Sequence, residues 1–264
     1  MRPKSKTSPT RRRISESTSV DAPFYRPGEG RLVPAVFVAR PNRFAIVASV
    51  GGRHVRAASR DPGRLAELLQ PGVRLLLAPA PLGSARRTAY TVVLVRKGRR
   101  WVSVVPALAN EVLVSALARN RVPGLRGARV LAREIHHGRS RFDFLLLHRG
   151  HRLLVEVKSA TLVEDGVALF PDAPTVRGAR HVRELTERVR RGGRAAIVFV
   201  VQRHDAGALR PHAENDPAFA AALEEATRAG VRVLGYACRV TRQGVVLERR
   251  IPVRSAAQRS PRTS

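Results

Sequence analysis

The sequence has one cysteine, four lysines and few aromatic residues, and its acidic residues are greatly outnumbered by basic ones. A lone cysteine, Cys238, excludes a disulfide framework or a thiolate zinc cluster within one chain, which fits a reducing compartment, and no disulfide-linked partner is expected. No apolar run approaches the roughly 20 residues of a membrane-spanning helix, so no membrane contact is expected. These absences predict a soluble, cytoplasmic protein.

The 264 residues include 49 basic and 20 acidic side chains, a formal net charge of +29. An excess of this size attracts polyanions by counterion release and long-range steering, and nucleic acid is the first candidate partner. Of the basic residues 45 are arginine, which a GC-rich genome also produces by turning surface lysines into arginines. Such drift does not explain the shortage of acids, so charge favours a polyanion partner over a merely solvated basic surface.

Composition and pattern divide the chain into four parts. Residues 1–30 are basic and polar, with almost no apolar residue before Phe24, so we expect a disordered basic arm rather than a secretory or transit peptide. Residues 31–106 and 107–253 are expected to fold as two domains, and residues 254–264 form a second small polar tail. The expected fold class is mixed α+β.

The first folded part consists of short β-rich runs separated by turn residues, which is typical of a small β-barrel. The expected strands are residues 32–39, 44–50, 53–58, 73–78, 89–95 and 101–105. A helical segment at residues 64–69, ended by Pro71 and Gly72, falls where a five-stranded barrel of the OB type carries its cap. With 14 basic and 2 acidic residues, this barrel is a plausible nucleic-acid platform.

The second folded part alternates helices and strands in the order αβββαβ, followed by αββ. The expected helices are residues 109–119, 175–191 and 216–228, and the expected strands are residues 129–136, 142–148, 153–161, 195–202, 231–240 and 245–251. Gly192 and Gly193 are expected to end the second helix, and Asp216 followed by Pro217 to begin the third.

Asp143, Glu156 and Lys158 are the candidate catalytic residues. The two-residue period of a strand places Glu156 and Lys158 on one face and the neighbouring valines on the other, and a short hairpin could bring Asp143 beside Glu156. Two carboxylates can hold Mg²⁺ or Mn²⁺ through oxygen, and the ammonium can orient or activate the attacking water in phosphodiester hydrolysis. By the same alternation, Asp143 is expected to point away from Phe142 and Phe144.

This pattern alone is weak, because an exposed strand face with an ion pair would look the same. Two observations favour a site. The three residues fall on the second and third strands of the αβββαβ order, which resembles the arrangement of PD-(D/E)XK nucleases. Lys158 is also one of only two lysines after residue 30, and lysine differs from arginine in being compact and able to lose its proton.

Several longer segments resemble the signature of the sugar fermentation stimulation protein family. The matching segments are residues 134–144, 155–162, 170–173 and 177–185, and the resemblance runs from about Leu108 to Val253. It implies an OB-like domain fused to a nuclease-like domain in a bacterial DNA-binding protein. The barrel departs from the family pattern, since Arg60-Asp61-Pro62-Gly63 stands where the family has Pro-Asn-Thr-Gly.

Six further residues are secondary candidates. Glu134 is either a third metal ligand or an ion-pair partner of Arg139 or Arg141, and these two arginines are the candidates for placing a phosphate at the metal. His181 and Glu184 share one helical face, which either flanks the catalytic residues or packs and faces solvent. Asp172 either caps the following helix or reaches the site.

Two functional hypotheses follow. The first is a DNA-binding protein with a Mg²⁺- or Mn²⁺-dependent phosphodiesterase site, which contacts DNA mostly through phosphates and without strong sequence preference. The second is a non-enzymatic DNA-binding regulator of sugar metabolism that retains a nuclease-like fold.

Overall fold

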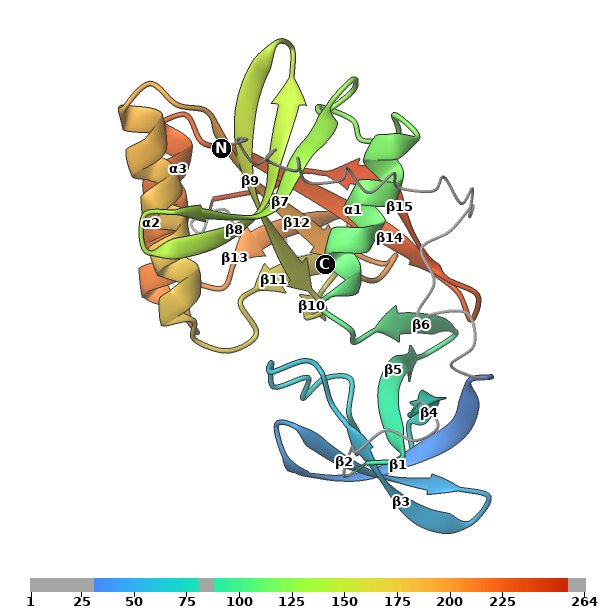
Figure 1. Cartoon of the computed structure of the whole chain (residues 1–264). Helices are drawn as coiled ribbons and strands as arrows, with labels where there is room; N and C mark the ends of the chain where they lie inside the picture. The colour runs from blue at the N-terminus through green and yellow to red at the C-terminus, as the bar shows by residue number, and fades with distance from the viewer. Residues whose placement is uncertain (1–30, 81–87, 256–264) are drawn as a thin grey trace, which may run out of the picture.

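The structure is a computed structural model that describes residues 31–80 and 88–255. The expected basic arm, residues 1–30, and residues 256–264 of the expected tail lie outside the described residues. The chain forms a β-barrel domain and a larger mixed α/β domain that lie one below the other (Figure 1). None of the helices in the described ranges is long and apolar enough to cross a membrane.

The barrel is built from strands β1 to β6. Their bounds are β1 Val33–Asn42, β2 Ala45–Val50, β3 Arg53–Ala58, β4 Arg74–Pro79, β5 Tyr90–Lys97 and β6 Arg100–Ser103. The sheet order is β3-β2-β1-β4-β5-β6, and a parallel pairing of β3 with β5 closes the first five strands into an OB-like barrel. Its interior is filled by alternating apolar side chains such as Phe37, Ile46 and Leu77. The predicted barrel is therefore confirmed.

The helix expected at residues 64–69 does not form. This segment makes a single turn, in which the amides of Leu68 and Leu69 donate to the carbonyl of Leu65. Leu65 has a φ of 52°, which is incompatible with a right-handed helix, and its own N–H donates to Asp172 Oδ2 of the other domain at 2.7 Å. A contact between domains thus overrides the local preference for a helix.

The second domain has a six-stranded sheet between two layers of helix. The elements of this sheet and its helices are α1 Leu108–Ala118, β7 Arg129–His137, β8 Ser140–His148, β9 His151–Ala160, α2 Val176–Arg190, β12 Ala195–Val201, α3 Pro217–Arg228, β14 Arg232–Val240 and β15 Val245–Ile251. The sheet order is β15-β14-β12-β9-β8-β7. Helix α1 covers one face, and α2 and α3 cover the other (Figure 1). The predicted αβββαβ order is confirmed.

Three short strands were not predicted. They are β10 Val163–Glu164, β11 Val167–Phe170 and β13 Ala208–Pro211, which form a small sheet in the order β10-β11-β13. The parallel pairing of β11 with β13 joins segments about forty residues apart in the sequence. This small sheet fixes the segment that leads from β11 into α2.

Polar contacts hold the two domains together. Arg203, which is almost fully buried, binds Asp205 through two nitrogens and also contacts Glu67 of the barrel. The Asp172 carboxylate accepts from the barrel as described, and Gln202 accepts from the Ser103 amide at 3.1 Å. Because these groups are buried or half-buried and are paired, they favour one relative orientation of the domains.

Candidate active site

The candidate residues meet where β8 and β9 separate. The ladder between the two strands runs from the pair His148 and His151 to the pair Phe144 and Val155 and stops there. Beyond it, Asp143 Oδ2 accepts a hydrogen bond from the Val157 amide at 2.7 Å, and Oδ1 accepts one from Asn110 Nδ2 of α1 at 2.7 Å. Where the two strands separate, the Asp143 carboxylate therefore replaces a backbone carbonyl as the acceptor for the Val157 amide.

The simple alternation expected around Asp143 is wrong. Phe142 and Phe144 are both buried, but Phe142 packs in the core under α2 and α3, whereas Phe144 packs in the core under α1. Because β8 leaves its partner between these residues, their side chains do not share a face. Asp143 lies at this change of direction, and its carboxylate is held from the α1 side.

Glu156 is the centre of a buried charge cluster. Its Oε1 atom lies 2.6 Å from Lys158 Nζ and 2.7 Å from His181 Nδ1 of α2. The side chains of Glu156 and Lys158 are only 6% and 12% exposed. The charged face of β9 is therefore not a solvated surface: α2 covers it, and His181 contacts it directly.

The second oxygen of Glu156 has no partner. Glu156 Oε2 is buried and makes no hydrogen bond within the described structure. An unsatisfied buried carboxylate oxygen is costly. A cation or the O–H of a water molecule bound at this oxygen would satisfy it.

The environment shifts the pKa values of the Asp143 and Glu156 carboxyl groups in opposite directions. Burial raises the pKa of Asp143, the charge of Glu156 raises it further, and the hydrogen bonds from Val157 and Asn110 only partly oppose this. Burial alone would also raise the pKa of Glu156, but His181 and Lys158 outweigh it and hold the pKa below its ordinary value. Paired carboxylates with different affinities for a proton are typical of sites that bind metal or transfer protons.

Two residues of the cluster were not predicted from the sequence. Asn110 binds Asp143, and Arg177 Nε of α2 lies 3.3 Å from His181 Nε2. The position of Arg177 beside His181 follows from helical spacing of four residues, so this signal was available. The Asn110 contact joins residues 33 apart, and no local pattern indicates it.

The remaining candidates lie outside the cluster. Arg141 Nε forms an ion pair of 2.7 Å with Glu134 Oε2, and both side chains are more than half exposed. Glu134 therefore takes its alternative role of an ion-pair partner, and Arg139 is exposed beside it. Glu184 packs under the β7–β8 turn at Gly138, where its Oε2 atom is buried without a partner. Asp172 accepts from the barrel rather than from the helix that follows it.

Lys158 opens into a cavity between the domains. The cavity has a volume of about 370 Å³ and is lined on one side by the end of β9 and by the segment from Leu169 to Thr175. The barrel supplies the opposite wall through Arg43 and residues 61–63. Access to the lysine therefore depends on both domains.

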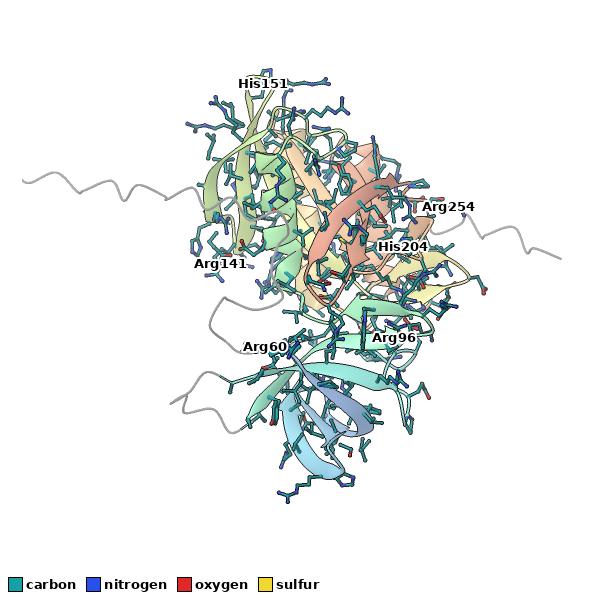
Figure 2. All side chains as sticks on the ribbon, turned by 90° about the vertical axis from the view of Figure 1, so that its right-hand side faces the viewer. Arg60, Arg96, Arg141, His151, His204 and Arg254 are labelled. Atoms are coloured by element: carbon teal, nitrogen blue, oxygen red, sulfur yellow. The ribbon has the colours of Figure 1, made fainter. Side chains whose placement is uncertain are left out.

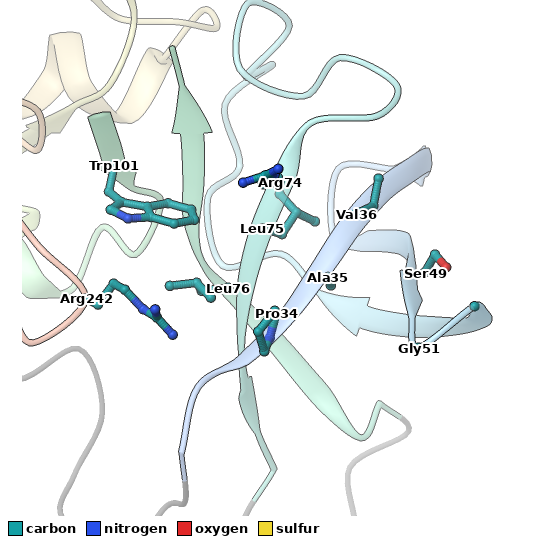
Figure 3. Close-up of a pocket in the computed structure, with 11 residues that line it drawn as sticks. Pro34, Ala35, Val36, Ser49, Gly51, Arg74, Leu75, Leu76, Trp101 and Arg242 are labelled. Atoms are coloured by element: carbon teal, nitrogen blue, oxygen red, sulfur yellow. The ribbon is translucent and has the colours of Figure 1, made fainter. Parts of the chain in front are cut away.

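Another cavity of about 420 Å³ lies elsewhere along the domain junction (Figure 3). Trp101, Arg74 and Arg242 surround it, and Arg96 stacks on the Trp101 ring with 5.0 Å to the centroid. No acidic side chain lines this cavity, so it lacks the groups that hold a hard metal ion.

Comparison with known proteins relates both domains of the chain to one family. Residues 107–244 match the family described as "Sugar fermentation stimulation protein RE domain", and residues 38–104 match "SfsA N-terminal OB domain". The chain belongs to the sugar fermentation stimulation protein family. The sugar fermentation stimulation protein homolog of Moorella thermoacetica is 47% identical over 79% of this chain and 90% of its own length.

Further members of the family are also similar to this chain in sequence and in structure. The homolog of Methanothermobacter thermautotrophicus is 42% identical over 76% of this chain and 83% of its own length. Among solved structures, SfsA of Pyrococcus furiosus in complex with Ca²⁺ superposes with a TM-score of 0.78 at 30% identity, covering 84% of this chain and 96% of that one. The expected family and its two-domain fold are thus confirmed for this chain.

Proposed function

We propose that this member of the sugar fermentation stimulation family is a DNA-binding protein that hydrolyses phosphodiester bonds with Mg²⁺ or Mn²⁺. The observation that carries the proposal is the buried, unpartnered Oε2 atom of Glu156 beside Lys158 and near Asp143. A carboxylate pair with an adjacent lysine is the donor set that metal-assisted phosphodiester hydrolysis uses.

The residues present fit a hard divalent cation. Among the described residues no three Asp, Glu, His or Cys side chains are grouped to hold an ion, but Mg²⁺ commonly binds through one or two carboxylates and keeps several waters. Asp143 retains lone pairs beyond its two hydrogen bonds, and Glu156 Oε2 is free. That the relative from Pyrococcus furiosus was solved with Ca²⁺ supports an oxygen-liganded cation here.

The surrounding residues would then have separate tasks. When bound, the cation would polarise the phosphoryl oxygen and lower the pKa of a bound water. Lys158 would orient that water with its ammonium, and His181 would fix the Glu156 carboxylate by its hydrogen bond at Oε1. Asn110 would hold Asp143 in place from α1.

A nuclease assay with a Lys158→Ala variant tests the proposal. We expect wild type to cleave at least one of a single-stranded oligonucleotide and the tailed duplex of the same sequence, and only with Mg²⁺ or Mn²⁺. Lys158→Ala should lose at least about 100-fold in rate, the lower range for losing one acid–base group. Arg191→Ala, at an exposed ion pair on α2, is the matched loss of a positive charge and should keep full activity. Cleavage that survives Lys158→Ala would overturn the assignment of this lysine.

DNA contacts are proposed to be spread over both domains. Basic side chains project from the barrel, as at Arg60 and Arg96, and from the β7–β9 region, as at Arg141 and His151 (Figure 2). Residues 31–106 carry a net charge of +12 and residues 107–253 a net charge of +10, counted from the sequence. Binding through phosphates on so broad a surface is strongly salt-dependent and reads little sequence.

Arg139 and Arg141, four and two residues before Asp143 in the sequence, remain the proposed phosphate contacts. We expect Arg139→Ala to weaken binding to unrelated duplexes equally and to flatten the slope of log K against log salt by about one. Glu134→Gln should strengthen binding, because it frees Arg141 from its ion pair. Measured titrations in which neither variant changes the slope would remove these arginines from the interface.

The second hypothesis, a non-enzymatic DNA-binding regulator, has one observation in its favour. Both oxygens of Asp143 already accept hydrogen bonds, and Oε1 of Glu156 is doubly occupied. A protein that binds DNA with the same salt slope but cleaves none with either metal would be this regulator.

A further inference from the structure

A continuous groove leads from the barrel surface to Lys158. The cavity of about 370 Å³ at Lys158 adjoins a second cavity of about 520 Å³, and the two share lining residues from both domains. The shared residues are Arg43, Pro62, Gly63, Ala173 and Pro174. Each volume lies in the range of about 300–1,000 Å³ found for pockets that hold small molecules, which is the scale of single nucleotides and not of a paired duplex.

Basic side chains lie at both ends of the groove. Arg40, Arg43 and Arg64 line its outer part, and Lys158 lies at its inner end. Among the described residues, the side chains of Arg43 and Arg64 take part in no ion pair. Their guanidinium groups are therefore available to phosphate, which they can bind through two parallel hydrogen bonds.

Two carboxylates in the groove are already engaged. Asp61 Oδ1 accepts from the Gly63 amide at 2.8 Å, and Asp172 Oδ2 accepts from the Leu65 amide at 2.7 Å. Arg40 lies beside both and donates to the Asp61 carbonyl. These acids therefore fix the barrel loop, and among the described residues neither forms an ion pair with Arg43 or Arg64.

An exposed aromatic residue, Phe44, directly follows Arg43, which lines both cavities. Phe44 is 64% exposed and is the only exposed Phe, Tyr or Trp in the part of the chain that the structure describes. Its backbone is fixed, because its N–H donates to Asn42 Oδ1 and its carbonyl accepts from the Ser59 amide. It lies in the β1–β2 turn, and a solvent-exposed ring on a hydrogen-bonded backbone is suited to stacking on a base.

We propose that the DNA strand that reaches Lys158 is single-stranded, and that it enters along this groove with a base stacked on Phe44 and its phosphates on Arg43 and Arg64. The inference rests on the proposed function, since it names the form of DNA that the same site takes. Because both domains wall the groove, we infer that it takes one strand, and that a duplex must be frayed, tailed or nicked before its phosphodiester reaches the lysine. Blunt duplex binds the outer basic surface without entering.

Binding without metal tests the groove separately from catalysis. The probes are a fluorescent single-stranded 20-mer and the blunt duplex of the same sequence, titrated in EDTA so that no cleavage occurs. We expect Phe44→Ala to lower affinity for the single strand about tenfold, within the range for losing one stacked base, and to change duplex affinity less than twofold. Phe44→Tyr keeps the ring and should keep the affinity.

Two matched controls come from the other cavity of the domain junction. Val36, 40% exposed, and Arg74 line that cavity. Val36→Ala should leave both affinities unchanged. Arg74→Ala should weaken single-strand and duplex binding equally, as a general loss of charge, whereas Arg43→Ala should weaken the single strand more.

The outcomes separate the two proposals. If wild type cleaves DNA with Mg²⁺ but Phe44→Ala binds the single strand as wild type does, the groove proposal is wrong and the nuclease proposal stands. If wild type cleaves nothing but Phe44→Ala loses single-strand affinity, the groove is a binding site and the nuclease proposal is wrong. A stronger preference of wild type for cleaving blunt duplex over tailed duplex would also overturn the groove.

Discussion

At the scale of single residues, Glu156 determines how the candidate site is held. Its side chain joins β9 to α2 through His181 and neutralises Lys158, while its other oxygen has no partner. Buried ion pairs contribute little net stability when compared with apolar residues, but removing one member leaves the other charge buried. Glu156 is therefore both structural and chemical.

Glu156→Gln should destabilise the protein by about 3 kcal/mol, the lower range for removing one partner of a buried ion pair. Glu187→Gln, at an exposed ion pair on α2, is the control and should change the free energy of unfolding by less than about 0.5 kcal/mol. Urea unfolding at neutral pH measures both. Equal stability of the two variants would mean that Lys158 and His181 do not depend on Glu156.

The residues of the site differ in how far the sequence could predict them. Glu156 and Lys158 are two apart on one strand, so alternation alone places them together. Asp143 was predicted near Glu156 by the hairpin, but its link to α1 through Asn110 was not, because helix packing joins residues far apart in sequence. For His181 the sequence leaves two roles open, flanking the catalytic residues or packing and facing solvent. Only the packing of α2 on the sheet decides between them.

At the scale of elements, one carboxylate fixes the start of two helices. Asp216 is the N-cap of α3, where it accepts from the Phe219 amide at 2.9 Å, and it also accepts from the amide of Thr175, the N-cap of α2, at 2.7 Å. It is 6% exposed. Because α2 carries His181 and Arg177, this side chain sets the position of part of the site.

Asp216→Ala should cost about 2–3 kcal/mol, because it removes a cap and leaves the buried Phe219 amide and the half-buried Thr175 amide without an acceptor. Thr175→Ala removes only the cap that Thr175 provides to Gly178 and should cost about 1 kcal/mol. Thermal unfolding followed by circular dichroism compares them. A smaller loss in Asp216→Ala than in Thr175→Ala would contradict the double role.

Elements with a strong local signal were predicted, and those made by long-range contacts were not. The start of α3 was predicted from Asp216 and Pro217, and a helix end from Gly192. The strands β11 and β13 are four residues each and are stabilised by pairing across the chain. The turn at residues 64–69 has an apolar pattern that favours a helix, but the bond from Leu65 to Asp172 decides its conformation.

At the scale of the whole molecule, the domain junction contains both an ion pair, at Arg203, and a pair of neighbouring carboxylates, Asp61 and Asp172. The Arg203 guanidinium is satisfied by Asp205, Glu67 and the Thr161 carbonyl. On the side of the junction that lines the groove, Asp61 of the barrel and Asp172 of the second domain approach each other at Gly63. A Cβ atom added at Gly63 would lie 2.9 Å from Asp61 Oδ1 and 2.7 Å from Asp172 Oδ2. Two carboxylates so close disfavour the state in which both are charged.

Burial and the charge of Asp172 raise the pKa of Asp61 to about 6, although the Gly63 amide and Arg40 oppose the shift. A folded pKa above the unfolded one means that the folded state binds the proton more tightly, so the stabilisation is complete below the unfolded pKa and is lost as pH rises through about 6. For a shift of this size the loss is about 3 kcal/mol. The barrel should therefore be held most firmly to the second domain in acid.

Asp61→Asn should remove this pH dependence. The amide keeps an oxygen for the Gly63 N–H and offers its NH₂ group to Asp172, so repulsion becomes a hydrogen bond, and asparagine is also what the family pattern has at this position. We expect wild type to lose about 2 kcal/mol of unfolding free energy between pH 4 and pH 6 relative to Asp61→Asn, and the variant to be the more stable protein at pH 7. Urea unfolding at pH 4, 5, 6 and 7 measures this, with Glu164→Gln as the control at an exposed carboxylate. A difference between wild type and Asp61→Asn that stays constant over this range would show that Asp61 is charged in the folded protein throughout, and that the junction does not respond to pH.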